Sequence, residues 1–378
     1  MARIVISGYY GFDNIGDEAV LLSMIFSFRK LNQDLDIVVL SSSPELTSSR
    51  YQVESINRNN FVKIIKEIKK ADLFISGGGS LLQDVTGWKS IPYYSGLAYT
   101  AVLLNTKTAF YAQGVGPVSG KANKFLVKKT AKKMDYISVR DKKSYDFLVS
   151  LGLAAEDINI SVDPVFSLKK ELSTEKQSAG VIKSKLTGSS VNNNDNDKNK
   201  ISKYEKPLIG IVVRPWGNNQ YISKIAAAAE RLVKDIEGQL VVIPMHYQQD
   251  MSVSKRFVSL VDGPVKLFEA KNGPAEKIKL FAGLDLLIGV RLHSLIFAAL
   301  HNVPIVAVSY DPKVWEFLNS CSLNSAVAIE DFDKDALYRI SKTVWDNRNQ
   351  FSSILQARGQ LFYQKAMQDA EAVLKLLE

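Results

Sequence analysis

Short apolar runs rich in β-branched residues alternate with segments of helical period along most of the chain. Near-continuous apolar strands joined by crossover helices are typical of a parallel sheet that is covered on both faces. Because the alternation is interrupted once and then resumes, the pattern predicts two such domains. The predicted strands span residues 3–7, 36–40, 72–76, 107–112 and 136–139 in the first domain, and 208–213, 239–244, 285–288 and 304–308 in the second.

The interruption is a polar segment, and its centre, residues 192–200, consists of Asn, Asp and Lys alone. Such a composition buries too little apolar surface to offset the entropy of ordering, so we expect a mobile linker or loop. The predicted fold class is α/β, with two Rossmann-like domains that face each other across a cleft. The expected organisation is an N-terminal domain at 1–168, the linker at 169–206, a C-terminal domain at 207–350, and a C-terminal helix at 351–378 that could pack back on the N-terminal domain.

The chain has 378 residues, a formal net charge of +9 and a single cysteine, Cys321. Its first residues lack the pattern of a secretory signal, no apolar stretch is long enough to span a membrane, and one cysteine cannot form a disulfide framework. We therefore expect a cytoplasmic protein. Few histidines, without the spacing of zinc sites, lead us to expect no metal and no cofactor. The positive charge fits simple solubility, a phosphate-bearing substrate or a membrane face, and no nucleic-acid motif is visible.

Glycine-rich motifs follow three of the predicted strands of the first domain, at residues 8–18, 76–84 and 112–117. Glycines let a backbone approach a ligand, and a following helix N-terminus offers free amides to an anion. The alternatives are structural: Asp17 and Glu18 could merely cap a helix, and Arg140 could pair with Asp141 rather than meet an anion. Taken as a substrate site, the candidate residues are Gly11, Asn14, Gly16, Asp17, Glu18, Gly78, Gly79, Gln83, Asp84 and Arg140.

The second domain carries arginine and histidine where strands end. Arg214 follows one predicted strand, and Arg291 and His293 lie at the turn from another strand into an apolar helix. A planar guanidinium can bind a carboxylate or phosphate with paired bonds, and a histidine can exchange protons near neutral pH. His246 also ends a strand and fits either a site or a supporting role. His301, late in an apolar helix, is interpreted as structural.

These motifs, in this order and spacing, resemble the polysaccharide pyruvyltransferase family. The resemblance extends over both domains, through residues 8–18, 76–84, 113–117, 138–141, 244–250 and 289–294. It is greatest for CsaB-type members, which pyruvylate secondary cell-wall polymers of Gram-positive bacteria. The asparagine-rich run and the tail lie outside it.

The resemblance implies a GT-B-like fold, phosphoenolpyruvate as donor and no required metal. It also implies a β-linked N-acetylmannosamine acceptor on a lipid-diphosphate precursor and a 4,6-ketal product, which surface-layer homology domains bind. The family's Arg-x-His donor signature carries over to Arg291, Leu292 and His293, and its upstream arginine to Arg214. His246 is placed with this donor set. For the chemistry, His293 is the expected proton donor, and Asp17 or Glu18 could act as base toward the sugar.

Two other functions fit a fold of this kind. A GT-B glycosyltransferase would bind a nucleotide sugar in the second domain, and a non-catalytic module would bind wall polymer without turnover. A lectin has no need of two arginines and a histidine at strand ends, which favours the transferase. If the acceptor is lipid-linked, peripheral contact with the inner face of the membrane is expected through Lys124, Lys128, Lys129, Lys132 and Lys133, unless these lysines form an ordinary solvated face. The oligomeric state is not predicted.

Overall fold

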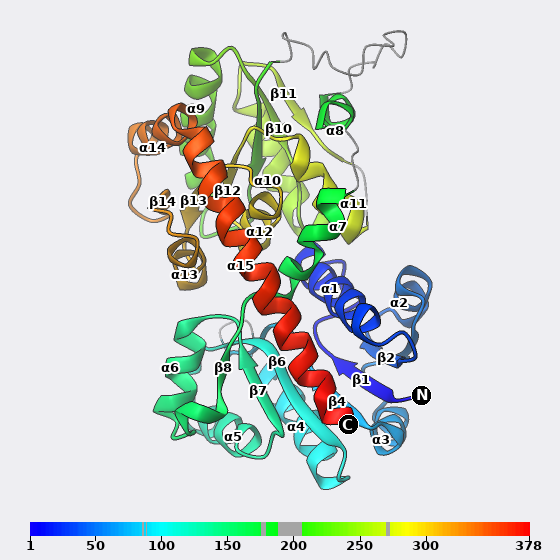
Figure 1. The fold of residues 1–378 in the computed structure, drawn as a ribbon. Helices are drawn as coiled ribbons and strands as arrows, with labels where there is room; N and C mark the ends of the chain where they lie inside the picture. The colour runs from blue at the N-terminus through cyan, green and yellow to red at the C-terminus, as the bar shows by residue number, and fades with distance from the viewer. Residues whose placement is uncertain (85–86, 88, 175–178, 188–205, 270–272) are drawn as a thin grey trace. The chain divides into compact units, whose positions relative to one another are not determined.

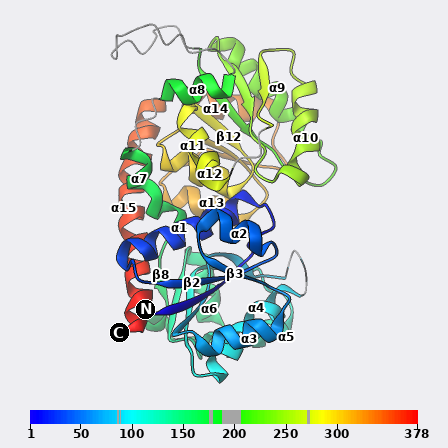
Figure 2. The same ribbon diagram turned by 90° about the vertical axis from the view of Figure 1, so that its right-hand side faces the viewer.

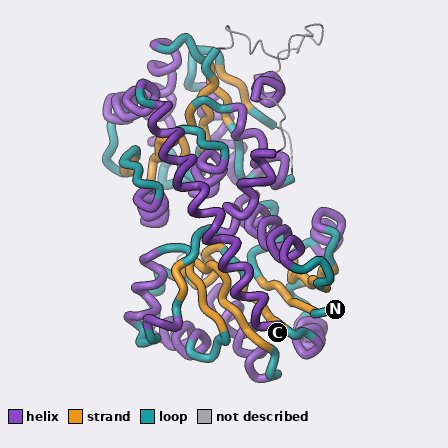
Figure 3. Tube along the Cα trace, viewed as in Figure 1, coloured by secondary structure: helices purple, strands orange, loops and turns teal. Residues whose placement is uncertain are grey.

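The computed structural model describes residues 1–84, 87, 89–174, 179–187, 206–269 and 273–378 (Figure 1). The chain divides into two compact units. Unit 1 contains Met1–Leu168 and Leu361–Glu378, and unit 2 contains Lys169–Gln360. In each unit, helices surround a central parallel sheet, as Figure 3 shows by secondary structure.

The sheet of unit 1 has the strand order β3-β2-β1-β4-β6-β7-β8, and β5 pairs with β6. All of these pairs are parallel, and, apart from the short link at 77–78 between β4 and β5, each connection crosses over the sheet. The order reverses direction after β3, and right-handed crossovers then put α1 and α2 on one face and α3 to α6 on the other. The strands are β1 (Arg3–Ser7), β2 (Asp36–Ser41), β3 (Glu54–Asn57), β4 (Leu73–Ser76), β5 (Gly79–Leu82), β6 (Lys107–Val115), β7 (Tyr136–Val139) and β8 (Asn159–Ile160).

Figure 2 shows these two helical layers, with α1 and α2 on one side of the strands and α3, α4 and α5 on the other. The second layer shares one apolar core with the sheet, in which Ile64, Leu97 and Val127 are buried against strand residues such as Phe74 and Phe110. The helices are α1 (Ile15–Leu31), α2 (Pro44–Tyr51), α3 (Phe61–Lys70), α4 (Ser90–Leu103), α5 (Lys121–Ala131) and α6 (Lys142–Ser150), followed by the short η1 (Ala155–Asp157) and η2 (Pro164–Leu168).

The C-terminal helix α15 (Arg348–Leu374) begins in unit 2 and ends in unit 1, before the short η4 (Lys375–Leu377). Its last part packs on the sheet of unit 1 through the buried Asp369. The carboxylate accepts hydrogen bonds from the Tyr136 hydroxyl at 2.6 Å and the Ser138 hydroxyl at 2.9 Å. Phe362 also packs edge-on against Phe166, with ring centroids 4.9 Å apart. The helix therefore completes unit 1, although it is remote from the rest of that unit in sequence.

The sheet of unit 2 has the strand order β11-β10-β9-β12-β13-β14, again with parallel pairs. Its strands are β9 (Leu208–Val212), β10 (Gln239–Val242), β11 (Val265–Leu267), β12 (Leu286–Gly289), β13 (Ile305–Ser309) and β14 (Ala326–Ala328). Its helices are α7 (Lys169–Thr174), α8 (Ala179–Thr187), α9 (Tyr221–Asp235), α10 (Tyr247–Ser259), α11 (Pro274–Leu280), η3 (Phe281–Gly283), α12 (Leu292–Leu300), α13 (Pro312–Ser320) and α14 (Lys334–Asp346).

The structure differs from the sequence-based expectation between residues 169 and 187. Residues 169–174 and 179–187 were expected to be part of a mobile linker, but they form α7 and α8 of unit 2. Ile182 and Leu186 are buried, and the Lys183 ammonium pairs with the Asp285 carboxylate at 2.9 Å. Apolar side chains at helical spacing thus hold α8 on the unit. The asparagine-rich run at 192–200 lies outside the described residues.

Two further boundaries differ. The strand expected at 107–112 continues to Val115, so Gln113 lies within β6 and not in a loop. Its side-chain nitrogen donates to the Ser76 hydroxyl at 2.5 Å, inside the sheet. The glycine-rich segment after β4 also returns to the sheet at once, as β5. Parts of both glycine-rich motifs are therefore strand residues of the sheet, and only the remainder forms loops.

Candidate functional site

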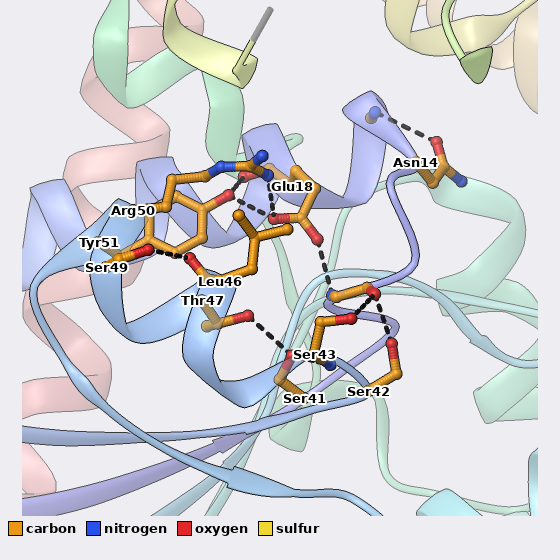
Figure 4. A network of polar contacts seen from close by, with 12 residues as sticks. Asn14, Glu18, Ser41, Ser42, Ser43, Leu46, Thr47, Ser49, Arg50 and Tyr51 are labelled. Atoms are coloured by element: carbon orange, nitrogen blue, oxygen red, sulfur yellow. Dashed lines mark hydrogen bonds and ion pairs between the residues drawn. The ribbon is translucent and has the colours of Figure 1, made fainter. Parts of the chain in front are cut away.

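The loop between β1 and α1 is closed by a helix cap. The Asn14 side-chain oxygen accepts from the Gly16 amide at 3.2 Å (Figure 4). The Asn14 amide group donates to the Asp17 carboxylate at 2.5 Å. Asn14, and not Asp17, is thus the N-cap of α1. Asp17 is half-buried, and its Oδ1 lies 3.2 Å from the point where a side chain at Gly79 would begin. Because Gly79 has φ +102°, both space and backbone conformation favour glycine there.

Glu18 anchors the same loop from inside the unit. Its side chain is 2% exposed, and its carboxylate accepts from the Gly11 amide at 2.7 Å and the Tyr51 hydroxyl at 2.5 Å, with the Arg50 guanidinium at 3.4 Å (Figure 4). Burial, reinforced by the neighbouring Glu18 charge, raises the pKa of Tyr51 far above its ordinary value. Gly11 has φ +79°, and a side chain there would clash with the Ser41 hydroxyl. Glu18 therefore holds the backbone of the loop in place.

Arg140, another candidate of unit 1, forms its hydrogen bonds with residues of the same unit. Arg140 donates to the Asp163 carboxylate at 2.8 Å and to the Ser80 hydroxyl at 2.8 Å, whereas Asp141 is 4.0 Å away. Asp163, which the sequence analysis did not consider, is thus the main partner of Arg140.

The Asp84 carboxylate accepts hydrogen bonds from the backbone amides of Ser119 and Gly120 at 3.0–3.1 Å. Burial raises the pKa of Asp84, but the hydrogen bonds from Gly120, Asn123 and Ser119 outweigh it, and the pKa is lowered. Gln83 is buried beside it. Gly78 approaches α1 closely, since a side chain there would begin 2.9 Å from Val20. The Asp84 carboxylate therefore holds the turn between β6 and α5 in place.

In unit 2, neighbouring strands bring Arg214 and Arg291 to one sheet edge. β9 and β12 are paired, with Val212 opposite Gly289, and each arginine lies two residues beyond the end of its strand. The Arg214 guanidinium donates to the hydroxyl of Tyr310, which follows β13. Trp216 stacks on the same ring, with centroids 3.9 Å apart. Two arginines therefore stand at the carboxyl end of the parallel sheet, where such folds bind ligands.

A buried carboxylate orients Arg291. Asp250 is completely buried, and its Oδ1 accepts from Arg291 Nη2 at 2.5 Å. Its other oxygen accepts from the backbone amides of Met245 at 3.2 Å and His246 at 2.9 Å. His246 is buried as well, and its ring nitrogen caps α10 by accepting from the Gln249 amide at 3.4 Å. His246 thus helps to shape the turn that presents Asp250.

The turn from β12 into α12 presents backbone donors next to Arg291. Arg291 is the N-cap residue of α12, and its side chain makes no capping bond. Leu292 and His293 form the first helical turn, where amides point out of the helix and attract anions. At the other end of α12, the buried His301 ring bonds to the Ile278 carbonyl at 3.0 Å. Burial chiefly lowers the pKa of His301 to about 4, so this histidine is neutral and structural.

The two arginines retain unused hydrogen-bonding capacity. Within the described part of the chain, the buried Nε atoms of Arg214 and Arg291 have no hydrogen-bond partner. Buried donors are normally satisfied, so an incoming acceptor would relieve both groups. Asp250, Tyr310 and Tyr221, whose hydroxyl accepts from the Arg214 amide at 3.0 Å, are supporting residues that the sequence analysis missed. Among the described residues, no cluster of three or more histidine, cysteine or carboxylate side chains could hold a metal ion.

Solved structures share this architecture over nearly the whole chain. A UDP-GlcNAc 2-epimerase from Neisseria meningitidis, bound to UDP-GlcNAc, superimposes with a TM-score of 0.68 at 11% identity, covering 99% of this chain and 100% of that chain. HepE from Anabaena, in complex with UDP-glucose, gives 0.66 at 12% identity and 99% of both chains. S. aureus MnaA with UDP gives 0.63 at 12% identity, covering 94% of this chain and 91% of that chain. At such identities the likeness shows the fold alone, which is GT-B-like, with two Rossmann-like domains.

The family is shown by sequence. The model of the polysaccharide pyruvyl transferase family matches residues 14–312, which include Asn14, Asp17 and Glu18 at the start of α1 and the strand ends that carry Arg214 and Arg291. The chain therefore belongs to this family, and it is an enzyme that transfers a pyruvyl group to a polysaccharide. No curated protein is similar enough to count as a match.

Proposed function

We propose that the enzyme takes the pyruvyl group from phosphoenolpyruvate and attaches it as a 4,6-ketal to a sugar of a lipid-diphosphate-linked wall-polymer precursor, with release of phosphate. The acceptor sugar that we favour is β-linked N-acetylmannosamine, as in the CsaB-type enzymes that the chain resembles. The observation that carries the donor half of the proposal is the pair Arg214 and Arg291 at adjacent strand ends, each with a buried and unpartnered Nε among the described residues.

Phosphoenolpyruvate is a compact polyanion with a carboxylate and a phosphate. Guanidinium groups bind such groups with paired, charge-assisted bonds, and the amides at the start of α12 add further donors. Asp250 accepts from Nη2 of Arg291 and so fixes the position of the guanidinium. Tyr310 does the same for Arg214. In this proposal Arg214 and Arg291 bind the donor, whereas Asp250 and Tyr310 are positioning residues.

The reaction needs a proton and two sugar hydroxyls. Protonation of the donor's methylene carbon makes its central carbon electrophilic, and the first hydroxyl attacks that carbon while a base takes its proton. Phosphate then leaves with the proton of the second hydroxyl, which closes the ketal. His293, in the first turn of α12, is the proposed proton donor, because it follows Arg291 by two residues and because histidine is the side chain that most often transfers protons in enzymes.

On the acceptor side, the structure supports Asp17 over Glu18 as the base toward the sugar. Glu18 is buried and bonded to the loop backbone through Gly11 and to Tyr51. Asp17 is only half-buried and lies beside Gly79, where the backbone can approach a ligand. Asn14, which donates to Asp17, would then orient this carboxylate.

Calorimetric titration tests the donor assignment without any acceptor. Phosphoenolpyruvate should bind the whole enzyme, and UDP-GlcNAc, the ligand of the structurally similar epimerase, serves as the competing candidate. Binding of the nucleotide sugar with no response to phosphoenolpyruvate would overturn the donor proposal and favour a nucleotide-sugar glycosyltransferase.

A further inference from the structure

One face of unit 1 is a basic layer with exposed apolar side chains. The helices α3, α4 and α5 lie side by side on it, α3 against α4 and α4 against α5 (Figures 1 and 2). α3 carries four lysines and α5 carries another four, while α4 has no charged residue. The only acidic residue of the three helices, Glu67, is buried and paired with Arg3 and Lys70. The outward charge of this layer is therefore entirely positive.

The same face exposes apolar side chains that ordinary folding would cover. Within the described residues, five of the fourteen exposed large apolar side chains belong to these three helices. On α3, Phe61 is 53% exposed, Val62 80% and Ile65 45%, and these three form one patch in its first two turns. Leu103, 67% exposed, lies at the end of α4, and Phe125, 63% exposed, lies on α5. Such surface costs free energy in water, so a partner that covers it is favoured.

We infer that the start of α3 is a docking surface for an anionic lipid membrane. A helix that combines exposed apolar side chains with lysines and lacks exposed acidic groups matches the interfacial mode of membrane binding, in which apolar groups enter the headgroup boundary and lysines meet anionic lipids. Lys63, Lys66 and Lys69 provide this charge next to Val62 and Ile65. The lysines of α5 add to it, but on this account the apolar contact comes from α3.

The docking surface adjoins the candidate acceptor loop. Phe61 packs against Tyr93, with ring centroids 6.3 Å apart, and Tyr93 in turn lies under the Arg58 guanidinium, 4.4 Å from the ring centroid. Arg58 also lies 5.1 Å from the ring of Phe12, in the loop between β1 and α1. The aromatic contacts thus run from the first turn of α3 to the loop that precedes α1 and its Asp17. Among the described residues, no helix is long and apolar enough to cross a bilayer, so docking on this surface would be peripheral.

Co-sedimentation of the whole protein with vesicles tests the inference and needs no substrate. The probe is vesicles of phosphatidylglycerol and phosphatidylcholine in equal parts, with pure phosphatidylcholine vesicles for comparison. The doubly substituted Val62→Ser/Ile65→Ser protein should bind the anionic vesicles about tenfold more weakly or worse. Its matched control is Leu46→Ser, which removes an apolar side chain of equal exposure, 45%, from α2 on the other side of the sheet. The control should bind like the unsubstituted protein.

Charge reversal provides the second arm. Lys63→Glu/Lys66→Glu should weaken binding about thirtyfold or more, because each lysine near an anionic surface contributes on the order of 1 kcal/mol. The control Lys30→Glu/Lys365→Glu carries the same change of net charge on α1 and α15. High salt should release the unsubstituted protein. Absence of binding to anionic vesicles at low salt overturns the inference, as does an equal loss in the controls.

A second copy of the chain is the competing occupant of this face. Light scattering of the same variants distinguishes the two occupants. The membrane assignment is overturned if the unsubstituted protein is a dimer that does not bind vesicles and the Val62→Ser/Ile65→Ser protein is a monomer. Titration with phosphoenolpyruvate on the same samples keeps this result separate from the proposed function, since donor binding in unit 2 should be unchanged in every variant of α3.

Discussion

Replacing Arg291 by lysine tests the donor site in a way that the structure makes quantitative. The guanidinium gives Nη2 to Asp250 at 2.5 Å and keeps a buried Nε that has no partner among the described residues. An ammonium keeps the charge but cannot serve Asp250 and an incoming anion in the same planar geometry. Loss of one charge-assisted bond to the donor costs about 1.5–3 kcal/mol, which is about a 10- to 150-fold rise in the Kd for phosphoenolpyruvate.

The assay is calorimetric titration of phosphoenolpyruvate, with thermal unfolding of the same samples. Arg291→Met is expected to bind the donor still more weakly and also to unfold at lower temperature, because it leaves Asp250 buried without its cation, a change that costs about 3–5 kcal/mol. Arg231→Lys is the matched control, since Arg231 pairs with Asp335 at 2.9 Å on the exposed surface of the same unit. Unchanged donor affinity in a well-folded Arg291→Lys protein would refute the assignment.

Three further predictions follow from other contacts of the site and its supports. His293→Gln should retain donor binding and lose most of its single-turnover rate, by about 10²–10⁴-fold, and lost binding with an intact rate at saturation would make His293 a binding residue. Asp17→Asn should lower turnover without changing the melting temperature. Glu18→Gln should instead lower the melting temperature, because it weakens buried hydrogen bonds worth about 1–3 kcal/mol. The opposite pattern would exchange the roles of the two carboxylates. Burial lowers the pKa of His301 to about 4, so the unfolded chain binds more protons between about pH 4 and 6.5 and stability falls as pH drops through that range. His301→Gln should flatten this part of the stability profile, and an unchanged slope would show that other groups cause it.

Local patterns predicted much of the architecture because strands and helices leave periodic signals. The strand before Gly8, the helix that starts near Glu18 and the turn at Arg291 all follow from apolar runs and from the glycines that end them. The segment 169–187 was misjudged because its polar neighbours dominated the composition. Ile182 and Leu186, four residues apart, were the signal for a packed helix.

The supports of the site were harder to predict because they depend on pairing between distant strands. Asp250 reads as an ordinary polar residue in the first turn of a helix, and only the adjacency of β10, β9 and β12 brings it to Arg291. The sequence offered Asp141 as the partner of Arg140, but the backbone turns the guanidinium toward Asp163. The sequence left open whether Glu18 caps a helix or acts as a base, whereas the fold buries it against Tyr51.

Incubation of the whole enzyme with phosphoenolpyruvate and a synthetic lipid-diphosphate disaccharide that ends in β-N-acetylmannosamine tests the central claim most directly. The account predicts a product heavier by one ketal-linked pyruvyl group, with one phosphate released for each transfer. It also predicts that no product forms when the 4-hydroxyl or the 6-hydroxyl of the acceptor is blocked. Phosphate release without a gain of mass on the acceptor, or transfer from UDP-GlcNAc in place of phosphoenolpyruvate, would contradict it.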